Sequence, residues 1–164
     1  MPIINNITRL LDSKKIPYTA FELSAEKHAA TETARLLGVD ALLVYKTIVV
    51  VREKGKPILA VIPGPNRVDL KLLASALGEK KVTLPTEREA EGLTGLQAGG
   101  ISPLALINKG FQVVIDSAAK GKGELHVSGG QRGLNIRLPV QALASLTNAR
   151  FGAISVPDLE DSMD

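Results

Sequence analysis

The first residue with chemical potential is Lys46, which stands in the almost wholly apolar, β-branched stretch 42–51. A lysine held among apolar neighbours needs an anion or water to meet its charge. Alternation predicts that Lys46 shares a face with Val44 and Ile48, which a buried sheet would direct inward or into a cleft. There it would act as a fixed cation beside a phosphate or a developing oxyanion. An edge strand with its lysine in solvent accounts for the same pattern equally well.

A glycine-rich loop is the second candidate site element, and it is made up of Gly99, Gly100, Ile101, Ser102 and Pro103. Adjacent glycines allow close backbone approach, and their amides can bind an anion or form an oxyanion hole without any side chain. A purely structural turn explains two adjacent glycines at least as well. The loop is therefore a candidate substrate-binding element whose alternative is a turn.

A second glycine-rich loop, Ser128–Gly133, follows a predicted strand and combines a hydroxyl, a flexible backbone and a guanidinium. These groups suit a ribose or a phosphate. The loop matches neither the phosphate-binding loop nor the dinucleotide-binding fingerprint, so those two interpretations fail. Ser128 and Gly129 are its candidate substrate-binding residues, and a hairpin turn is the alternative.

Other kinds of chemistry find little support in the residues. The chain has no Cys, which excludes disulfides, thiolate nucleophiles and cysteine metal sites. His28 and His126 are the only histidines, no nucleophile-elbow sequence accompanies them, and metal-ligand spacing is absent. The acidic residues of 87–91 are expected to form a solvated helix face. We therefore expect no metal and no cofactor.

Composition bounds the class of protein and its partners. With 164 residues, 45% hydrophobic and 23% charged, the chain fits one globular domain. Aromatic residues make up 3%, which argues against a stacking platform for successive bases. The net charge of +3 permits an RNA partner without demanding one. The pairs Lys80–Lys81 and Lys120/Lys122 are candidate anion-binding patches or simply solvated surface.

The sequence also suggests where the protein works. It begins without a basic segment followed by a long apolar run, and it has no stretch of about 18 apolar residues. A cytoplasmic protein with no signal peptide and no membrane contact is the expectation.

Periodicity and turn residues predict alternating helices and short strands, and hence an α+β fold with a single domain over residues 1–157. A mixed, curved sheet surrounded by helices is expected, followed by an acidic, loose tail at 158–164. Helices are predicted at about 6–15, from a Thr31 cap to Gly38, at 69–77, from Thr86 with a capping box to Glu89, and at 139–146. Strands are predicted at 18–23, 42–51, 57–62, 82–84, 111–116, 124–127, 134–138 and 151–156.

Three motifs in a fixed order resemble the YbaK/EbsC family, the free-standing relatives of the editing insertion domain of bacterial prolyl-tRNA synthetase. They are Tyr-Lys-Thr-Ile-Val-Val at 45–50, Gly-Gly-Ile-Ser-Pro at 99–103 and Val-Ser-Gly-Gly-Gln-Arg-Gly-Leu at 127–134. The similarity runs from Ile16 to Phe151. Each motif alone is weak, but together and in this order they are specific.

The resemblance implies a barrel-like, mixed-sheet α+β fold and deacylation of mischarged tRNA, which in the YbaK branch is Cys-tRNA(Pro). In that branch the lysine matched by Lys46 is required for activity. The glycine matched by Gly99 lines the pocket, and the resemblance implies that its loop holds the terminal adenosine and the ester. The serine matched by Ser128 also lies at the pocket. The segment 21–33 matches poorly, and we expect the choice of amino acid to be made there.

For a cysteinyl substrate, the family mechanism has the substrate's own thiol attack its ester and release a thiolactone. Lys46 would then anchor a phosphate or the ribose rather than act as a base. The aminoacylated 3′ end of tRNA is the expected partner, with prolyl-tRNA synthetase as a candidate second partner. Two alternatives stay open: a deacylase for Ala-, Ser- or Thr-tRNA, and a non-catalytic nucleotide- or RNA-binding module on the same fold.

Overall fold

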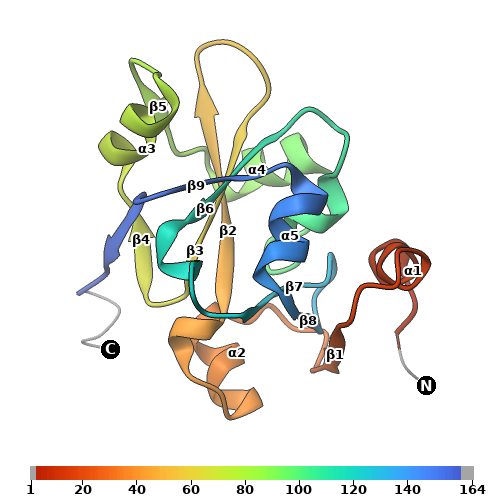
Figure 1. Ribbon diagram of the computed structural model, residues 1–164. Coiled ribbons are helices and arrows are strands. Elements are labelled where there is room, and N and C mark those ends of the chain that lie inside the picture. The colour runs from red at the N-terminus through yellow and green to blue at the C-terminus, as the bar shows by residue number, and fades with distance from the viewer. Residues whose placement is uncertain (1–2, 160–164) are drawn as a thin grey trace.

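A computed structural model describes residues 3–159 and has an α+β architecture (Figure 1). Its largest sheet is mixed. The strands β2 and β3 pair antiparallel, whereas β3 with β6 and β6 with β9 pair parallel. In spatial order the five strands are β5 (Val82–Thr83), β2 (Tyr45–Arg52), β3 (Ile58–Pro63), β6 (Gln112–Asp116) and β9 (Arg150–Gly152).

Two smaller antiparallel sheets complete the strands of the described chain. One has the order β1 (Thr19–Glu22), β8 (Leu134–Pro139), β7 (Glu124–Ser128), and the other pairs β4 (Asn66–Val68) with β10 (Ser155–Pro157). An isolated bridge between Val44 and His126 connects the large sheet to the three-stranded one. The expectation of a barrel-like sheet is therefore wrong, because the sheets do not close on one another. The predicted strand 151–156 is in fact two strands, β9 and β10, in different sheets.

The helices begin mostly where side chains can cap them. Asn5 forms a capping box with Thr8, Asp69 accepts from the Leu72 N–H, and Thr86 and Glu89 cap each other as predicted. The α-helices are α1 (Asn6–Ser13), α2 (Ala30–Leu37), α3 (Leu70–Leu77), α4 (Glu87–Thr94) and α5 (Val140–Thr147), and the short 3-10 helices are η1 (Ala41–Leu43), η2 (Pro103–Leu106) and η3 (Ser117–Ala119).

Helices α2 and α5 begin without a side-chain cap, and for α2 the predicted Thr31 cap is wrong. Helix α2 starts after Ala29, which makes no side-chain capping bond. Packing accounts for this start: a Cβ on Gly64 would lie 2.9 Å from Ala30 Cβ and 3.0 Å from the Val44 carbonyl oxygen. Ala30 and Gly64 are small enough for the first turn of α2 to pack against the turn that follows β3. Figure 1 shows α2 below the start of β2.

The core lies on both faces of the large sheet. One cluster includes Tyr45, Val49 and Leu59 together with residues of α5 and the three-stranded sheet. The other includes Val50, Ile58 and residues of α3. Because both faces are covered, every residue of β3 is buried.

Only the first two residues of the predicted tail 158–164 belong to the described part of the chain. The Asp158 N–H donates to the Pro65 carbonyl (3.1 Å). None of the helices within residues 3–159 has the length and apolar character needed to cross a membrane.

Candidate active site

A cavity of about 470 Å³ lies beside the first half of β2, and we call it the central cavity. This volume falls in the range that binds small molecules or the end of a larger ligand. Apolar and polar groups share its walls. Its lining residues are drawn from 23–33, 44–49, 84–90, 98–101 and 128–135, together with Gly64.

The cavity exists because β2 is paired on only one side over this stretch. Its pairing with β3 runs from Tyr45 to Val50, but β5 pairs only with Val51 and Arg52. Between these residues and the bridge at Val44, the other edge of β2 has no strand partner within the described chain. Successive residues of the strand therefore reach the cavity, and the open edge offers backbone hydrogen-bonding groups to an occupant.

Lys46 lies on this open stretch of β2, partly buried, and lines the central cavity together with Val44 and Ile48. It is opposite Ile62 of the fully buried strand β3, so the backbone that carries it is held rigidly. The stretch is an open edge of the sheet, as the alternative has it, but Lys46 is partly buried and lines the cavity. A cation on a rigid wall of a partly apolar cavity can meet an anionic group of an occupant.

Gly99 and Ile101 also line the cavity, at the tip of the first glycine-rich loop. Gly99 has φ +89°, a conformation that glycine adopts without strain, and a Cβ there would lie 3.1 Å from Lys27 Cγ. Gly100 has another role. Its N–H donates to the Gln97 carbonyl (2.8 Å), and a Cβ there would lie 2.9 Å from Gln131 Cα. The Gly100 amide is therefore used inside a structural turn, which is the alternative interpretation of this loop.

Gly100 and three other predicted site residues support the cavity walls without lining the central cavity. Ser102 is fully buried, and its Oγ accepts from the Leu104 N–H (3.2 Å) at the start of η2, whose first residue is Pro103. The Gly129 N–H donates to the Leu134 carbonyl (2.8 Å) and closes the β7–β8 hairpin. Their positions are set by local hydrogen bonds that the motif alone does not reveal.

Ser128 lines the cavity at the end of β7, directly opposite Asn135 of β8. Its Oγ accepts from the Gly130 N–H (3.2 Å), so the first residue of the second glycine-rich loop is tied to the loop itself. Sequence reasoning missed Asn135. Hairpin register was the available signal, because directly opposed residues of an antiparallel pair share a face.

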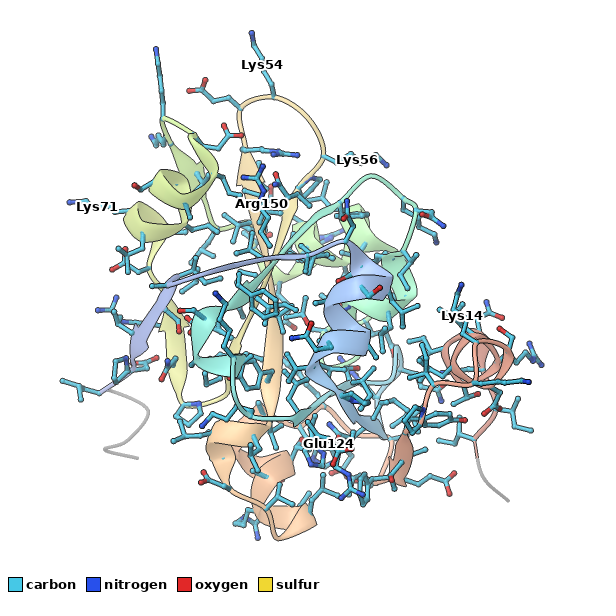
Figure 2. The ribbon with its side chains drawn as sticks, viewed as in Figure 1. Lys14, Lys54, Lys56, Lys71, Glu124 and Arg150 are labelled. Carbon is cyan, nitrogen blue, oxygen red and sulfur yellow. The ribbon has the colours of Figure 1, made fainter. Side chains whose placement is uncertain are left out.

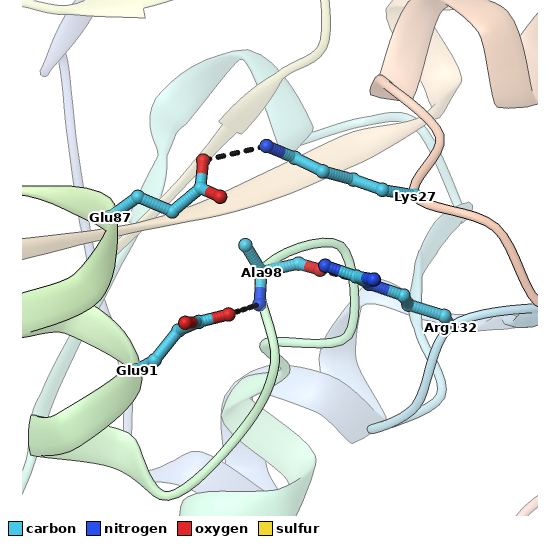
Figure 3. A network of polar contacts seen from close by, with 5 residues as sticks. All are labelled: Lys27, Glu87, Glu91, Ala98 and Arg132. Atoms are coloured by element: carbon cyan, nitrogen blue, oxygen red, sulfur yellow. Dashed lines mark hydrogen bonds and ion pairs between the residues drawn. The ribbon is translucent and has the colours of Figure 1, made fainter.

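The segment 21–33 contributes much of one wall, through Leu23 and several residues from Glu26 to Thr33. Lys27 Nζ forms an ion pair with Glu87 Oε2 of α4 (2.6 Å) across the cavity rim (Figure 3). Both side chains are about half exposed, at 50% and 59%. The prediction of a merely solvated face at 87–91 missed this pair, because only the tertiary fold brings α4 to the loop before α2.

A second contact of α4 fixes the first glycine-rich loop. Glu91 Oε2 accepts from the N–H of the buried residue Ala98 (2.8 Å), and the Ala98 carbonyl accepts from Arg132 Nε (2.7 Å). Figure 3 shows Ala98 held between these two side chains. Both glycine-rich loops and α4 are therefore joined at one residue, directly before Gly99.

The two acids on α4 should differ in their contribution to stability. Glu91→Ala leaves the buried Ala98 N–H without its acceptor, so we expect the free energy of unfolding to fall by about 1–3 kcal/mol. Glu87→Ala removes an exposed ion pair and should change it by less than about 1 kcal/mol. Urea denaturation of both variants measures the difference. Equal losses would contradict the role assigned to Glu91.

A family model described as the aminoacyl-tRNA editing domain matches residues 24–146. The chain belongs to the aminoacyl-tRNA editing domain family. The matched range holds every residue that lines the central cavity except Leu23.

The relatives of this editing domain agree with the resemblance drawn from the three motifs, which is confirmed. EbsC of Enterococcus faecalis, whose name assigns it as a Cys-tRNA(Pro)/Cys-tRNA(Cys) deacylase, is 37% identical over 155 residues, covering 93% of this chain and 94% of EbsC. A proline–tRNA ligase of Thermodesulfovibrio yellowstonii is 29% identical over 79 residues, which cover 48% of this chain and 14% of the ligase.

Solved structures share the fold of this editing domain. A crystal structure described as a trans-editing enzyme for prolyl tRNA synthetase superposes with a TM-score of 0.78 at 25% identity, covering 94% of this chain and 99% of that one. The hypothetical protein APE2540 superposes with a TM-score of 0.84 at 23% identity, covering 93% and 100%.

One arrangement at the rim of the editing domain resembles a nucleophile triad. His28 Nε2 lies 3.1 Å from Ser24 Oγ, and His28 Nδ1 lies 3.5 Å from Glu32 Oε1. However, His28 Nε2 also lies 3.1 Å from the Ser24 carbonyl oxygen, which can only accept a hydrogen bond. Ser24 is not among the residues that line the central cavity, so this serine is not presented to an occupant. The cluster instead ties the loop before α2 to its helix.

No metal-binding group is found in the described part of the editing domain, where no three His, Asp or Glu side chains gather. The labelled lysines Lys14, Lys54 and Lys71 project from different elements at the edges of the molecule (Figure 2). Of the candidate patches, Lys120 Nζ lies over the Phe151 ring, 5.5 Å from its centroid. Lys27 and Lys46 are the lysines that line the central cavity, and Lys27 is paired with Glu87.

His126 should make the stability of the editing domain depend on pH. Burial lowers its pKa below the ordinary value near 6.5, Arg137 acts in the same direction, and Asn135 and Glu124 oppose the shift. The unfolded chain therefore takes up the proton first as the pH falls below about 6.5. The stabilisation is complete above this pH and is lost as the pH falls through the lowered folded pKa.

The variant His126→Phe isolates this effect, because it retains an aromatic ring and removes the titrating group. We expect the free energy of unfolding of the unchanged protein to fall more than that of the variant between pH 7.5 and 5, by about 1.4 kcal/mol per pKa unit of lowering. Urea denaturation across this range measures the difference. A difference that does not vary with pH would contradict the assignment.

Proposed function

We propose that this chain deacylates mischarged tRNA, with Cys-tRNA(Pro) as its preferred substrate. The observation that carries the proposal is the 37% identity to the EbsC deacylase across 93% of this chain. The central cavity supports it, since about 470 Å³ suits a terminal nucleoside with its amino acid rather than a folded RNA element. The tRNA body would remain outside the cavity.

The reaction suits the residues of the site. An aminoacyl ester is already activated, so positioning and stabilisation of the developing oxyanion can supply most of the rate enhancement. The chain has no Cys, and Ser24, the serine beside His28, does not line the cavity. A protein nucleophile is therefore not part of the proposal.

For a cysteinyl ester, the substrate thiol attacks the ester carbonyl. A carbon–sulfur bond forms, the carbon–oxygen bond to the ribose breaks, and the thiol proton passes to the leaving ribose hydroxyl. The products are a cyclic thiolactone and deacylated tRNA, with no water consumed. Lys46 holds an anionic or ribose oxygen of the tRNA end and does not act as a base. Gly99, Ile101 and Ser128 form the wall against which this end is positioned.

The alternative substrates are Ala-, Ser- and Thr-tRNA, for which a bound water attacks in place of the thiol. The segment 21–33, which forms one wall, is the part of the site where the amino acid is chosen. Prolyl-tRNA synthetase is a candidate partner in delivering the tRNA. The local similarity to a proline–tRNA ligase supports that link.

A panel of purified mischarged tRNAs tests the proposal. The protein is incubated with Cys-, Ala-, Ser- and Thr-charged tRNA(Pro), with and without prolyl-tRNA synthetase, and ester loss is followed with time. The expected result is fastest loss of the cysteinyl ester with release of a thiolactone, identified by mass spectrometry. Release of free cysteine from the start would refute the thiol route, and no ester loss from any tRNA would favour a binding module.

A further inference from the structure

A set of polar and aromatic side chains lines one face of the three-stranded sheet and ends at the central cavity. The register places Thr19 opposite Arg137, Phe21 opposite Asn135, His126 opposite Arg137 and Ser128 opposite Asn135. Side chains at opposed positions share a face, while the other face carries core residues such as Leu125 and Val127. This polar face consists of Thr19, Phe21, His126, Ser128, Asn135 and Arg137.

Asn135 is the member of this face that is buried and also lines the cavity. It is 6% exposed. Its Oδ1 lies 2.8 Å from His126 Nδ1. Within residues 3–159 this is the one hydrogen bond of the Asn135 side chain, and Nδ2 makes none. Nδ2 is not among the fully buried side-chain atoms that lack a hydrogen-bond partner, so it is open to the space of the cavity, where it can donate to an occupant.

His126 fixes which end of the amide faces the cavity. The Asn135 oxygen can only accept, so His126 Nδ1 carries the proton of this bond. The imidazole packs against Phe21, whose ring centroid lies 5.5 Å away, and the backbone of His126 is bridged to Val44. With Oδ1 turned toward His126, the NH₂ group is the end of the amide left for the cavity.

We propose that Asn135 is a substrate-binding residue that donates a hydrogen bond from Nδ2 to an oxygen of the aminoacyl-ribose end, and that His126 is its positioning residue. This inference rests on the proposed function. Asn135 lies opposite Ser128, so the two side chains form a pair of polar contacts at the mouth of the β7–β8 hairpin. Lys46 on β2 contacts an anionic group of the substrate, and Asn135 on the β7–β8 hairpin donates a hydrogen bond to a neutral oxygen from another wall of the cavity.

The test separates the two ends of the amide. Asn135→Asp keeps the shape and the acceptor for His126 but replaces the cavity-facing donor by an oxygen. His126→Phe keeps a ring beside Phe21 but removes the donor that orients the amide. Asn66→Asp is the matched control, because Asn66 is an asparagine of a different sheet whose Nδ2 donates to Ser155 Oγ (2.9 Å).

Two measurements are made on each variant. Binding of 3′-(L-cysteinylamino)-3′-deoxyadenosine, in which an amide replaces the reactive ester, is measured by calorimetry. Single-turnover deacylation of Cys-tRNA(Pro) is measured in parallel. We expect Asn135→Asp to weaken binding and slow deacylation by about tenfold or more, because a site built to donate to an oxygen rejects the reversed polarity.

The positioning role predicts a distinct pattern for His126. His126→Phe should weaken binding by about three- to tenfold, and it should have little further effect in the presence of Asn135→Ala, because both changes remove one coupled interaction. His126→Asn, which restores a donor, should recover part of the affinity. Additive effects of His126→Phe and Asn135→Ala, or no recovery by His126→Asn, would overturn the positioning role.

The outcomes keep this inference apart from the proposed function. Analogue binding that weakens in Asn135→Asp but not in Asn66→Asp supports the inference even where no tRNA is deacylated. Binding unchanged in Asn135→Asp, or no binding by the unchanged protein, overturns it even where deacylation proceeds. If Asn135→Asp does not unfold cooperatively, Asn135→Ala makes the same comparison without placing a charge in the wall.

Discussion

Replacing Lys46 by alanine should lower the single-turnover rate of Cys-tRNA(Pro) deacylation by about 100-fold or more, the loss expected when a preorganised electrostatic contact is removed. Lys46 is the cation that β2 presents to the cavity from a stretch held against the buried strand β3. Alanine leaves the strand intact and removes the charge. The change should appear in the rate at saturating protein, measured by rapid quench.

The control for Lys46→Ala is Lys71→Ala. Lys71 is an exposed residue of α3 that projects from the edge of the molecule and does not line the cavity. Its removal changes the net charge by the same amount, so it corrects for weaker long-range attraction of tRNA. Lys71→Ala should keep nearly the full rate. Comparable rates for Lys46→Ala and Lys71→Ala would refute the role proposed for Lys46.

Replacing Gly99 by alanine should lower deacylation by about tenfold or more, because a small displacement of the loop misplaces the reacting end. The added Cβ would lie 3.1 Å from Lys27 Cγ and 3.5 Å from Arg132 Cγ, on a residue with φ +89°. Backbone strain at this φ should also reduce the free energy of unfolding by about 1–2 kcal/mol. Urea denaturation and single-turnover kinetics measure the two effects.

Gly121→Ala separates backbone strain from the loss of space. Gly121 has φ +84°, close to that of Gly99, but a Cβ there meets no atom within 4 Å and lies away from the cavity. It should lose a similar free energy of unfolding and keep its deacylation rate. A rate loss in Gly121→Ala equal to that in Gly99→Ala would show that general destabilisation, and not the cavity wall, is responsible.

Much of the secondary structure follows from local signals. The capping box of Thr86 and Glu89 is found where the sequence predicts it, and α1 and α3 begin close to the predicted positions, because a capping bond joins residues only three apart. Helix α2 departs from this rule. Its start is set by the close packing of Ala30 on Gly64, a contact between residues distant in the sequence. Local signals also could not predict whether the sheets close into a barrel, since that depends on which strand edges pair.

The candidate site divides in the same way. Lys46, Gly99, Ile101 and Ser128 were selected from motifs, and all of them line the central cavity. Gly100 belongs to the same motif but is used in a turn with Gln97. A motif identifies a set of residues that occur together, yet it does not distinguish those that line the cavity from those that maintain the conformation of the loop.

By itself, then, the sequence determined the family, the main elements and the lysine that stands alone in an apolar strand. Only the tertiary structure decided what surrounds Lys46. The edge of β2 is left open because β5 pairs with just two of its residues, and the cavity forms along that edge. Asn135 reaches it by hairpin register, and Glu87 by the packing of α4 against the loop that carries Lys27. These contacts join residues far apart in the chain, so no local pattern encodes them.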